Sequence, residues 1–234
     1  MDVIGLLPQL HLLRFAVGQA YLWRDGEDDL TLIDAGPVGS GGAIAEGIAS
    51  LGLSAHAVRR IVLTHFHEDH AGGAGEWEGV PVLVHRADAP YVRQERPGPP
   101  PVLEDWERPL HARVTQGLPP LSAAAVPAAV TEVRDGAVLP FGGGARVVHV
   151  PGHTEGSIAL HLPAHGVLFT GDTVAASPVD GAVMPGVFHQ DRPRALASLR
   201  RLAELETEVA CFGHGDAVTA GAGAVLRAVA GRAG

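Results

Sequence analysis

Short apolar runs separated by Gly and Asp clusters dominate the start of the chain. The runs 10–15, 20–23 and 30–33 are typical of consecutive strands, and Asp25-Gly26 suits a hairpin turn between two of them. Residues 40–51 space Ile and Leu as a helix does, and 60–63 is typical of a buried strand. Strand 81–84 and a helical start at 86–92 follow. The pattern therefore predicts alternating strands and helices.

The second half repeats this order of elements. We expect five strands, then a helix at 193–205, a strand at 208–212 and a final helix at 217–230; the five strands are 132–134, 137–139, 146–150, 157–162 and 167–170. Strands followed by helices, twice over, predict two α/β halves around one core, within a single domain spanning 1–234.

A Pro-rich stretch separates the two halves. Eight prolines fall between residues 96 and 127, so we expect an insertion or lid at about 93–127. Trp106, Leu103, Leu110 and His111 could cover an apolar substrate pocket there. A disordered or partner-contacting insertion is an equal alternative, because long loops serve either role.

Composition and charge remove several classes of protein. With 46% hydrophobic and 18% charged residues, the 234-residue chain is globular. Its net charge is −9 and all 17 basic residues are Arg, which disfavours a nucleic-acid partner. Cys211 is the single cysteine of the sequence, which excludes an internal disulfide and is compatible with a reducing cytosol. With no signal peptide and no run of eighteen apolar residues, we expect a cytoplasmic protein without a membrane partner, acting on a small-molecule substrate. The sequence does not decide whether the protein forms a homodimer.

Metal ligands are the strongest chemical signal. His65, His67, Asp69 and His70 lie within six residues, directly after an apolar strand. His65 and His67 are two apart, which in extended backbone places both imidazoles on one side. An isolated histidine is more often a hydrogen-bonded core or turn residue, but this run, together with the strand-end candidates below, is hard to produce by core packing alone. Imidazole and carboxylate together are ligands that Zn, Fe and Mn accept.

Three further candidates follow apolar strands in the second half. They are His153, Asp172 and His214, each beside a Gly. Because strand ends in an α/β fold meet at one edge, we expect all seven side chains to converge. They would hold two divalent ions, for which we expect zinc, with Fe or Mn as alternatives. One ion would be bound by His65, His67 and His153, and the other by Asp69, His70 and His214. Asp172 would lie between the two ions.

Four segments together resemble the signature of the metallo-β-lactamase-fold hydrolase superfamily, including its glyoxalase II-like members. They are Thr64-His-Phe-His-Glu-Asp-His-Ala-Gly-Gly73, Pro151-Gly-His-Thr-Glu-Gly-Ser157, Thr170-Gly-Asp-Thr173 and Gly213-His-Gly-Asp216. The resemblance implies a four-layer αββα sandwich with metals at one edge. Carried over by motif position, it gives the same two ligand sets. Asp34 resembles the family's strand-end Asp, which fixes the metal-bearing loop; a simple turn cap is the alternative.

The expected activity is metal-dependent hydrolysis. A metal-bridging hydroxide would cleave an ester, thioester, lactone or amide bond, with Asp69 as the catalytic group that holds its proton. The sequence does not match three branches of this superfamily. These branches use a Cys as a metal ligand, a helical C-terminal domain, or a Tyr shortly after the bridging Asp. The alternatives are a mononuclear iron persulfide dioxygenase, a lactonase-specific member and a non-catalytic binding module. We expect His189 to be a turn residue and Cys211 a buried small hydrophobe.

Overall fold

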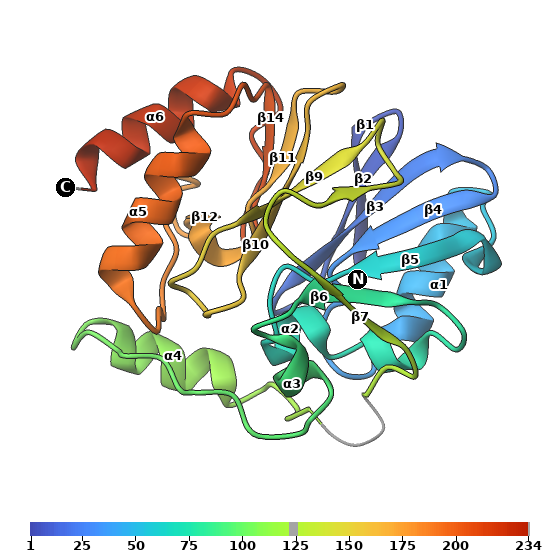
Figure 1. Cartoon of the computed structure of the whole chain (residues 1–234), viewed down its shortest axis with the longest axis horizontal. Coiled ribbons are helices and arrows are strands. Elements are labelled where there is room, and N and C mark those ends of the chain that lie inside the picture. Colours follow the sequence, from blue (N-terminus) through green and yellow to red (C-terminus); the bar gives the residue numbers. More distant parts are fainter. Residues whose placement is uncertain (122–125, 234) are drawn as a thin grey trace. The chain divides into compact units, whose positions relative to one another are not determined.

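The computed structural model describes residues 1–121 and 126–233. Contacts divide the chain into two compact units. Figure 1 labels the helices and strands of the chain. The first comprises Met1–Pro97 and Gly117–Val133, and the second comprises Gly98–Gln116 and Arg134–Gly234. The expectation of one domain over 1–234 stays a prediction, and positions 122–125 of the expected insertion lie outside the described residues.

The first unit is built on a seven-stranded sheet whose strands follow chain order from β1 to β7. Strands β1 to β4 pair antiparallel, whereas β4 to β7 run parallel. The strands are β1 (Asp2–Leu7), β2 (Leu10–Arg14), β3 (Gln19–Gly26), β4 (Asp29–Ile33), β5 (Val58–Val62), β6 (Val82–His85) and β7 (Val130–Val133). The parallel strands β4 and β5 therefore end at the same edge, where Asp34 and Thr64 follow them.

Helix α1 (Gly41–Ser50) covers the core of this unit. Its Ile44 and Ile48 are four residues apart, so they share one face of the helix. Both are fully buried in a cluster with sheet residues such as Leu22 and Leu32. Short helices α2 (Glu68–Ala71) and α3 (Ala89–Val92), with 3₁₀ turns at Ala55–Ala57 and Ala74–Glu76, complete the unit.

The second unit contains a five-stranded sheet in the order β14-β11-β10-β9-β8. The strands are β8 (Val138–Leu139), β9 (Ala145–His149), β10 (Ile158–Leu162), β11 (Val167–Phe169) and β14 (Val209–Cys211). Strand β10 is antiparallel to both β9 and β11, and β14 is parallel to β11. Strands β9, β11 and β14 thus point the same way, and their carboxyl ends share one edge.

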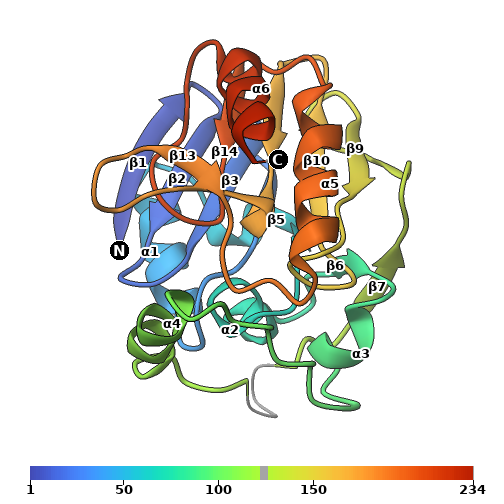
Figure 2. The same ribbon diagram turned by 90° about the vertical axis from the view of Figure 1, so that its left-hand side faces the viewer.

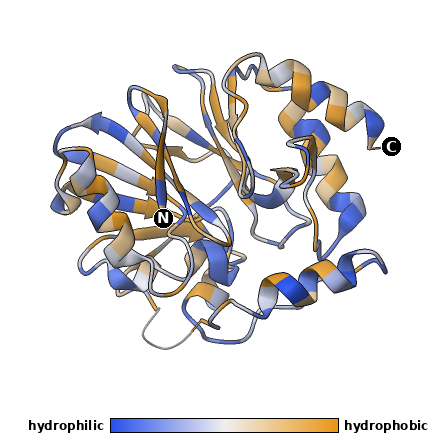
Figure 3. Cartoon of the chain, turned by 180° about the vertical axis from the view of Figure 1, so that it is seen from behind, coloured by the Kyte–Doolittle hydropathy of each residue, from blue (hydrophilic) through white to orange (hydrophobic). Residues whose placement is uncertain are grey.

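Two helices lie side by side over this sheet, α5 (Arg192–Ala203) and α6 (Ala222–Arg232) (Figure 2). Leu199 and Leu202 of α5 and Leu226 of α6 are fully buried in one cluster with the strands. Arg residues and Ser198 stand among the apolar positions of α5, whereas α6 has only Arg227 and Arg232 as charged residues. Figure 3 colours the chain by hydropathy. A two-stranded sheet, β12 (Val174–Ala176) and β13 (Val183–Pro185), follows the 3₁₀ turn Gly171–Thr173.

Several expected elements differ from those observed. The β3–β4 hairpin turns at Glu27 and Asp28, because Gly26 still pairs with Asp29. The last helix begins at Ala222 rather than at 217, since Gly221 before it is left-handed (φ 63°). The expected insertion contains helix α4 (Glu107–Thr115). Strand β1 and the β12–β13 pair were not expected. Within the described ranges, no helix has the length and apolar character needed to span a membrane.

Candidate metal centre

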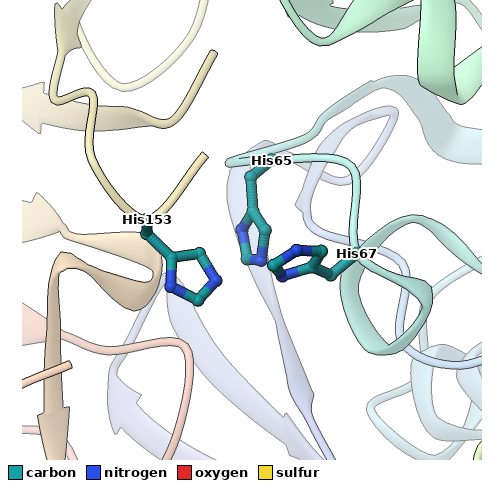
Figure 4. Close-up of side chains that lie close together, drawn as sticks. All are labelled: His65, His67 and His153. Carbon is teal, nitrogen blue, oxygen red and sulfur yellow. The ribbon is translucent and has the colours of Figure 1, made fainter. Parts of the chain in front are cut away.

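The four ligand candidates of the first unit lie where β5 ends. His65 and His70 are fully buried, and Asp69 is nearly so. The rings of His65 and His67 meet edge to face with centroids 4.7 Å apart (Figure 4), and the His65 and His70 centroids are 4.1 Å apart. The Nε2 atom of His70 is 3.6 Å from Asp69 Oδ2. The structure therefore brings this whole candidate set together.

Asp34 ties the ligand run to the end of β4. Its Oδ1 accepts the Thr64 backbone N–H at 2.7 Å, and its Oδ2 accepts the Thr64 hydroxyl and His70 Nδ1–H, both at 2.8 Å. Since that hydroxyl hydrogen points to Asp34, Thr64 Oγ1 accepts from His65 Nδ1 at 3.0 Å. Both histidines thus carry a hydrogen on Nδ1, so their Nε2 is the nitrogen with metal-binding capacity. The expected role of Asp34 in fixing this loop is confirmed.

Glycines let helix α2 approach the loop after β4. A Cβ on Gly72 would lie 2.3 Å from the Val38 backbone nitrogen, and a Cβ on Gly73 would lie 2.3 Å from the Ala35 carbonyl oxygen. The Ala35 N–H also donates to the His70 carbonyl at 2.7 Å. Any larger residue at Gly72 or Gly73 would push α2 and its two candidate ligands away, which explains why glycine stands at both positions.

The second unit carries the other three candidates at one sheet edge. His153, Asp172 and His214 follow β9, β11 and β14, whose carboxyl ends lie at one edge of the sheet. The Nδ1–H of His153 donates to the Val187 carbonyl at 3.1 Å, which leaves Nε2 as the nitrogen with metal-binding capacity. Figure 4 labels His153. Its loop is closed by Ser157, whose Oγ accepts the Thr154 backbone N–H at 2.9 Å.

Donor separations in the second unit fit a bound ion. The Nε2 atoms of His153 and His214 lie 3.5 Å and 3.2 Å from Asp172 Oδ2. Two ligands about 2.1 Å from one ion at the tetrahedral angle lie roughly 3.4 Å apart. Nitrogen and oxygen donors at these separations are the chemistry that zinc and similar divalent ions take, so these residues fit such a metal.

Two further histidines of the second unit bond to backbone carbonyls. His149 Nε2 bonds the Glu155 carbonyl at 2.8 Å, and His161 Nε2 bonds the Glu206 carbonyl at 3.0 Å. His189 is buried, with its ring 5.6 Å from that of His153. Burial lowers the pKa of His189, and the nearby Asp172 and Glu107 carboxylates only partly oppose this.

Cys211 is fully buried in β14, as expected of a small hydrophobic residue. Burial raises the pKa of its thiol far above the ordinary value. The sequence analysis did not identify Thr64, which connects Asp34 to His65 by hydrogen bonds, or the buried carboxylate Glu107. For Thr64, its position directly before His65 could have indicated this role.

Fold, ligand types and sequence agree on one family. The sequence profile of the metallo-β-lactamase superfamily matches residues 13–214, which include all seven candidate ligands. The chain belongs to this superfamily of metal-dependent hydrolases. The expected metallo-β-lactamase fold is confirmed: a metallo-β-lactamase family protein of Thermus thermophilus superimposes with a TM-score of 0.68 at 28% identity, covering 97% of this chain and 79% of that one.

Relatives that are similar in sequence are also named as hydrolases. A probable metallo-hydrolase of Bacillus subtilis, YqjP, is 28% identical over 227 residues, which cover 88% of this chain and 70% of the relative. A hydroxyacylglutathione hydrolase of Gloeobacter violaceus is 31% identical over 175 residues, covering 72% of this chain and 53% of that protein. An acyl-coenzyme A thioesterase of Gallus gallus, MBLAC2, is 32% identical over 151 residues, 62% of this chain and 50% of the relative.

Proposed function

We propose that this chain is a hydrolase with two divalent ions, zinc foremost, that cleaves an ester, thioester, lactone or amide bond of a small molecule. The observation that carries the proposal is the tautomer shared by three histidines. His65, His70 and His153 each have Nδ1 hydrogen-bonded to an oxygen, so each presents Nε2. Separate hydrogen-bond networks in the two units therefore orient these rings so that Nε2 is the nitrogen that can bind a metal.

The ligand assignment follows the partition expected from the sequence. His65, His67 and His153 would hold one ion, Asp69, His70 and His214 would hold the other, and Asp172 would serve both. The family match over 13–214 supports bringing the two sets into one centre. A thioester is the first substrate class to test, because two of the relatives are a hydroxyacylglutathione hydrolase and an acyl-coenzyme A thioesterase.

Each residue then has a defined task. Bound divalent ions supply an activated water and polarise the scissile carbonyl. Asp69, which is nearly buried beside His70, accepts and holds the proton of the attacking water. Asp34 keeps His70 and, through Thr64, His65 in the tautomer that presents Nε2. The Val187 carbonyl does the same for His153.

Metal content and activity of the same sample test this proposal. Protein purified without chelator should contain close to two Zn, Mn or Fe per chain and hydrolyse members of a thioester, lactone and β-lactam screen. His67→Ala should lower the metal content and abolish hydrolysis. His56→Ala, at an exposed position, is the matched control and should change neither.

Other outcomes would contradict the proposal. One iron per chain with oxygen uptake on a persulfide would favour the dioxygenase alternative. A protein that binds no divalent metal would rule out both enzymes and leave the binding module. If His67→Ala keeps the hydrolytic activity of wild type, the assignment of His67 as a metal ligand is wrong, although the chain still belongs to the family.

A further inference from the structure

Glu107 is a buried carboxylate in the segment Gly98–Gln116 of the second unit. It lies at the start of α4 and only 2% of its surface is exposed. Its Oε1 accepts the Phe188 backbone N–H at 3.0 Å, and its Oε2 accepts the Glu104 backbone N–H at 2.9 Å. A buried acidic side chain is costly unless hydrogen-bonded, and this one bonds a residue 81 positions away.

The peptide group that Glu107 contacts also contacts a candidate metal ligand. The N–H of the Val187–Phe188 peptide donates to Glu107, and the C=O of the same peptide accepts from His153 Nδ1 at 3.1 Å. Carboxylate, peptide and imidazole therefore form one continuous chain of hydrogen bonds. Phe188 adopts a left-handed conformation (φ 59°), which a non-glycine residue keeps only where surrounding contacts hold it.

Neighbouring backbone bonds hold this peptide in register. The Gln190 N–H donates to the His153 carbonyl at 3.2 Å, and the Asp191 N–H donates to the Gly152 carbonyl at 2.9 Å. From the other side, the Val102 N–H donates to the His189 carbonyl at 2.9 Å. Residues 187–191 are thus bonded both to the His153 loop and to the segment that carries Glu107.

This arrangement has an electronic consequence. A carboxylate that accepts a peptide N–H polarises the peptide and strengthens its carbonyl as an acceptor. A stronger acceptor at His153 Nδ1–H raises the electron density on Nε2, the nitrogen that faces Asp172. In metal sites a carboxylate often does this by direct contact with the histidine; here one peptide group stands between them.

We propose that Glu107 is a positioning residue of the metal centre, which orients His153 and strengthens it as a ligand through the Val187–Phe188 peptide. The inference rests on the proposed function, since it takes His153 to bind metal. It gives the segment Gly98–Gln116 a specific role: its buried carboxylate tunes metal binding.

Glu107→Gln tests the inference at nearly constant shape. The amide oxygen can still accept the Phe188 N–H, but the charge is gone and the NH2 group faces the Glu104 N–H. Zinc affinity, measured by competition with a chromophoric chelator, should fall about tenfold, and more for Glu107→Ala. Glu104→Gln is the matched control: it removes the same charge three residues away, from a half-exposed side chain paired with Arg192, and should stay within twofold of wild type.

A second measurement needs neither metal nor substrate. In the metal-free protein, the ¹H and ¹⁵N resonances of the His153 Nδ1–H group report its hydrogen bond directly. They should move upfield in Glu107→Gln and stay in place in Glu104→Gln. The His153→Gln variant, which lacks the signal, assigns it.

The outcomes separate this inference from the proposed function. If wild type binds zinc while Glu107→Gln and Glu107→Ala keep its affinity and the His153 resonance, the inference is wrong and the hydrolase proposal stands. A loss of urea stability without a change in either readout would make Glu107 a structural residue and would also overturn it. If wild type binds no divalent ion, both fail.

Discussion

Replacing Asp34 with asparagine tests the network that holds the ligand run of the first unit. Asp34 accepts three hydrogen bonds and lies in the left-handed region (φ 61°), which asparagine also adopts. The variant therefore keeps shape and backbone but replaces one acceptor oxygen by an NH2 group. With the amide oxygen at the Oδ1 position, that group faces His70 Nδ1. His70 must then move its hydrogen to Nε2, the nitrogen assigned to the metal.

Two separate effects follow from this change. The replaced oxygen, Oδ2, accepts two hydrogen bonds, from the Thr64 hydroxyl and from His70 Nδ1–H. The NH2 group accepts neither, and a hydrogen bond to a charged acceptor contributes about 1.5–3 kcal/mol, so the free energy of unfolding of the metal-free protein should fall by about 2 kcal/mol or more. The wrong tautomer should weaken zinc binding roughly 10- to 100-fold. Urea unfolding in the presence of chelator measures the first effect, and zinc competition measures the second.

Asp28→Asn is the control for the same chemical change at an exposed position, and its unfolding free energy should stay within about 0.5 kcal/mol of wild type. The reasoning is refuted if Asp34→Asn matches this control in both stability and zinc affinity. Lower stability with unchanged zinc affinity would refute only the tautomer argument.

The remaining predictions concern the second unit. Leu199→Ala removes a fully buried side chain of α5 and should lower the free energy of unfolding by about 2–5 kcal/mol in urea, whereas Val179→Ala, at a position 91% exposed, should have almost no effect; equal effects would contradict the packing described for α5. Burial acts to raise the pKa of Asp135, but the His149 N–H and the Arg201 guanidinium outweigh it and the pKa lies below the ordinary value. A lowered pKa in the folded state stabilises above about pH 4 and is lost as the pH falls, so the stability difference between wild type and Asp135→Asn should shrink from pH 7 to pH 3, and a difference independent of pH would show that the ion pair does not act through its charge.

The sequence predicted the elements that carry the candidate ligands because their signals are local. An apolar run before His65 and another before Asp172 are recognisable as buried strands, and the polar residues that follow mark the strand ends. The same locality explains the agreement for α1 and α5, whose buried positions recur at helical spacing. The position of Asp34 could also be predicted from the sequence, because it directly follows β4 and precedes Gly36.

Other features depend on contacts that no local pattern contains. Glu107 gains its partner 81 residues later, and its neighbours Trp106 and Arg108 give no sign of burial. Strand β1 includes Gly5, which interrupts its alternation, and owes its pairing to β2. Strands β12 and β13 are three residues each, too short for any periodicity. The start of α6 depends on the conformation of Gly221 rather than on the Ala and Val residues around it.

The path of the chain between the two units has a consequence for protein synthesis. Strand β6 ends at His85, but its parallel neighbour β7 begins only at Val130, after the segment 98–116 that belongs to the second unit. At roughly 5–20 residues per second, a ribosome needs about 2–9 s to deliver the missing strand. For that time the hydrogen-bonding edge of β6 is open to any other nascent strand. Slow translation across 98–116 would therefore promote misfolding of this chain in particular.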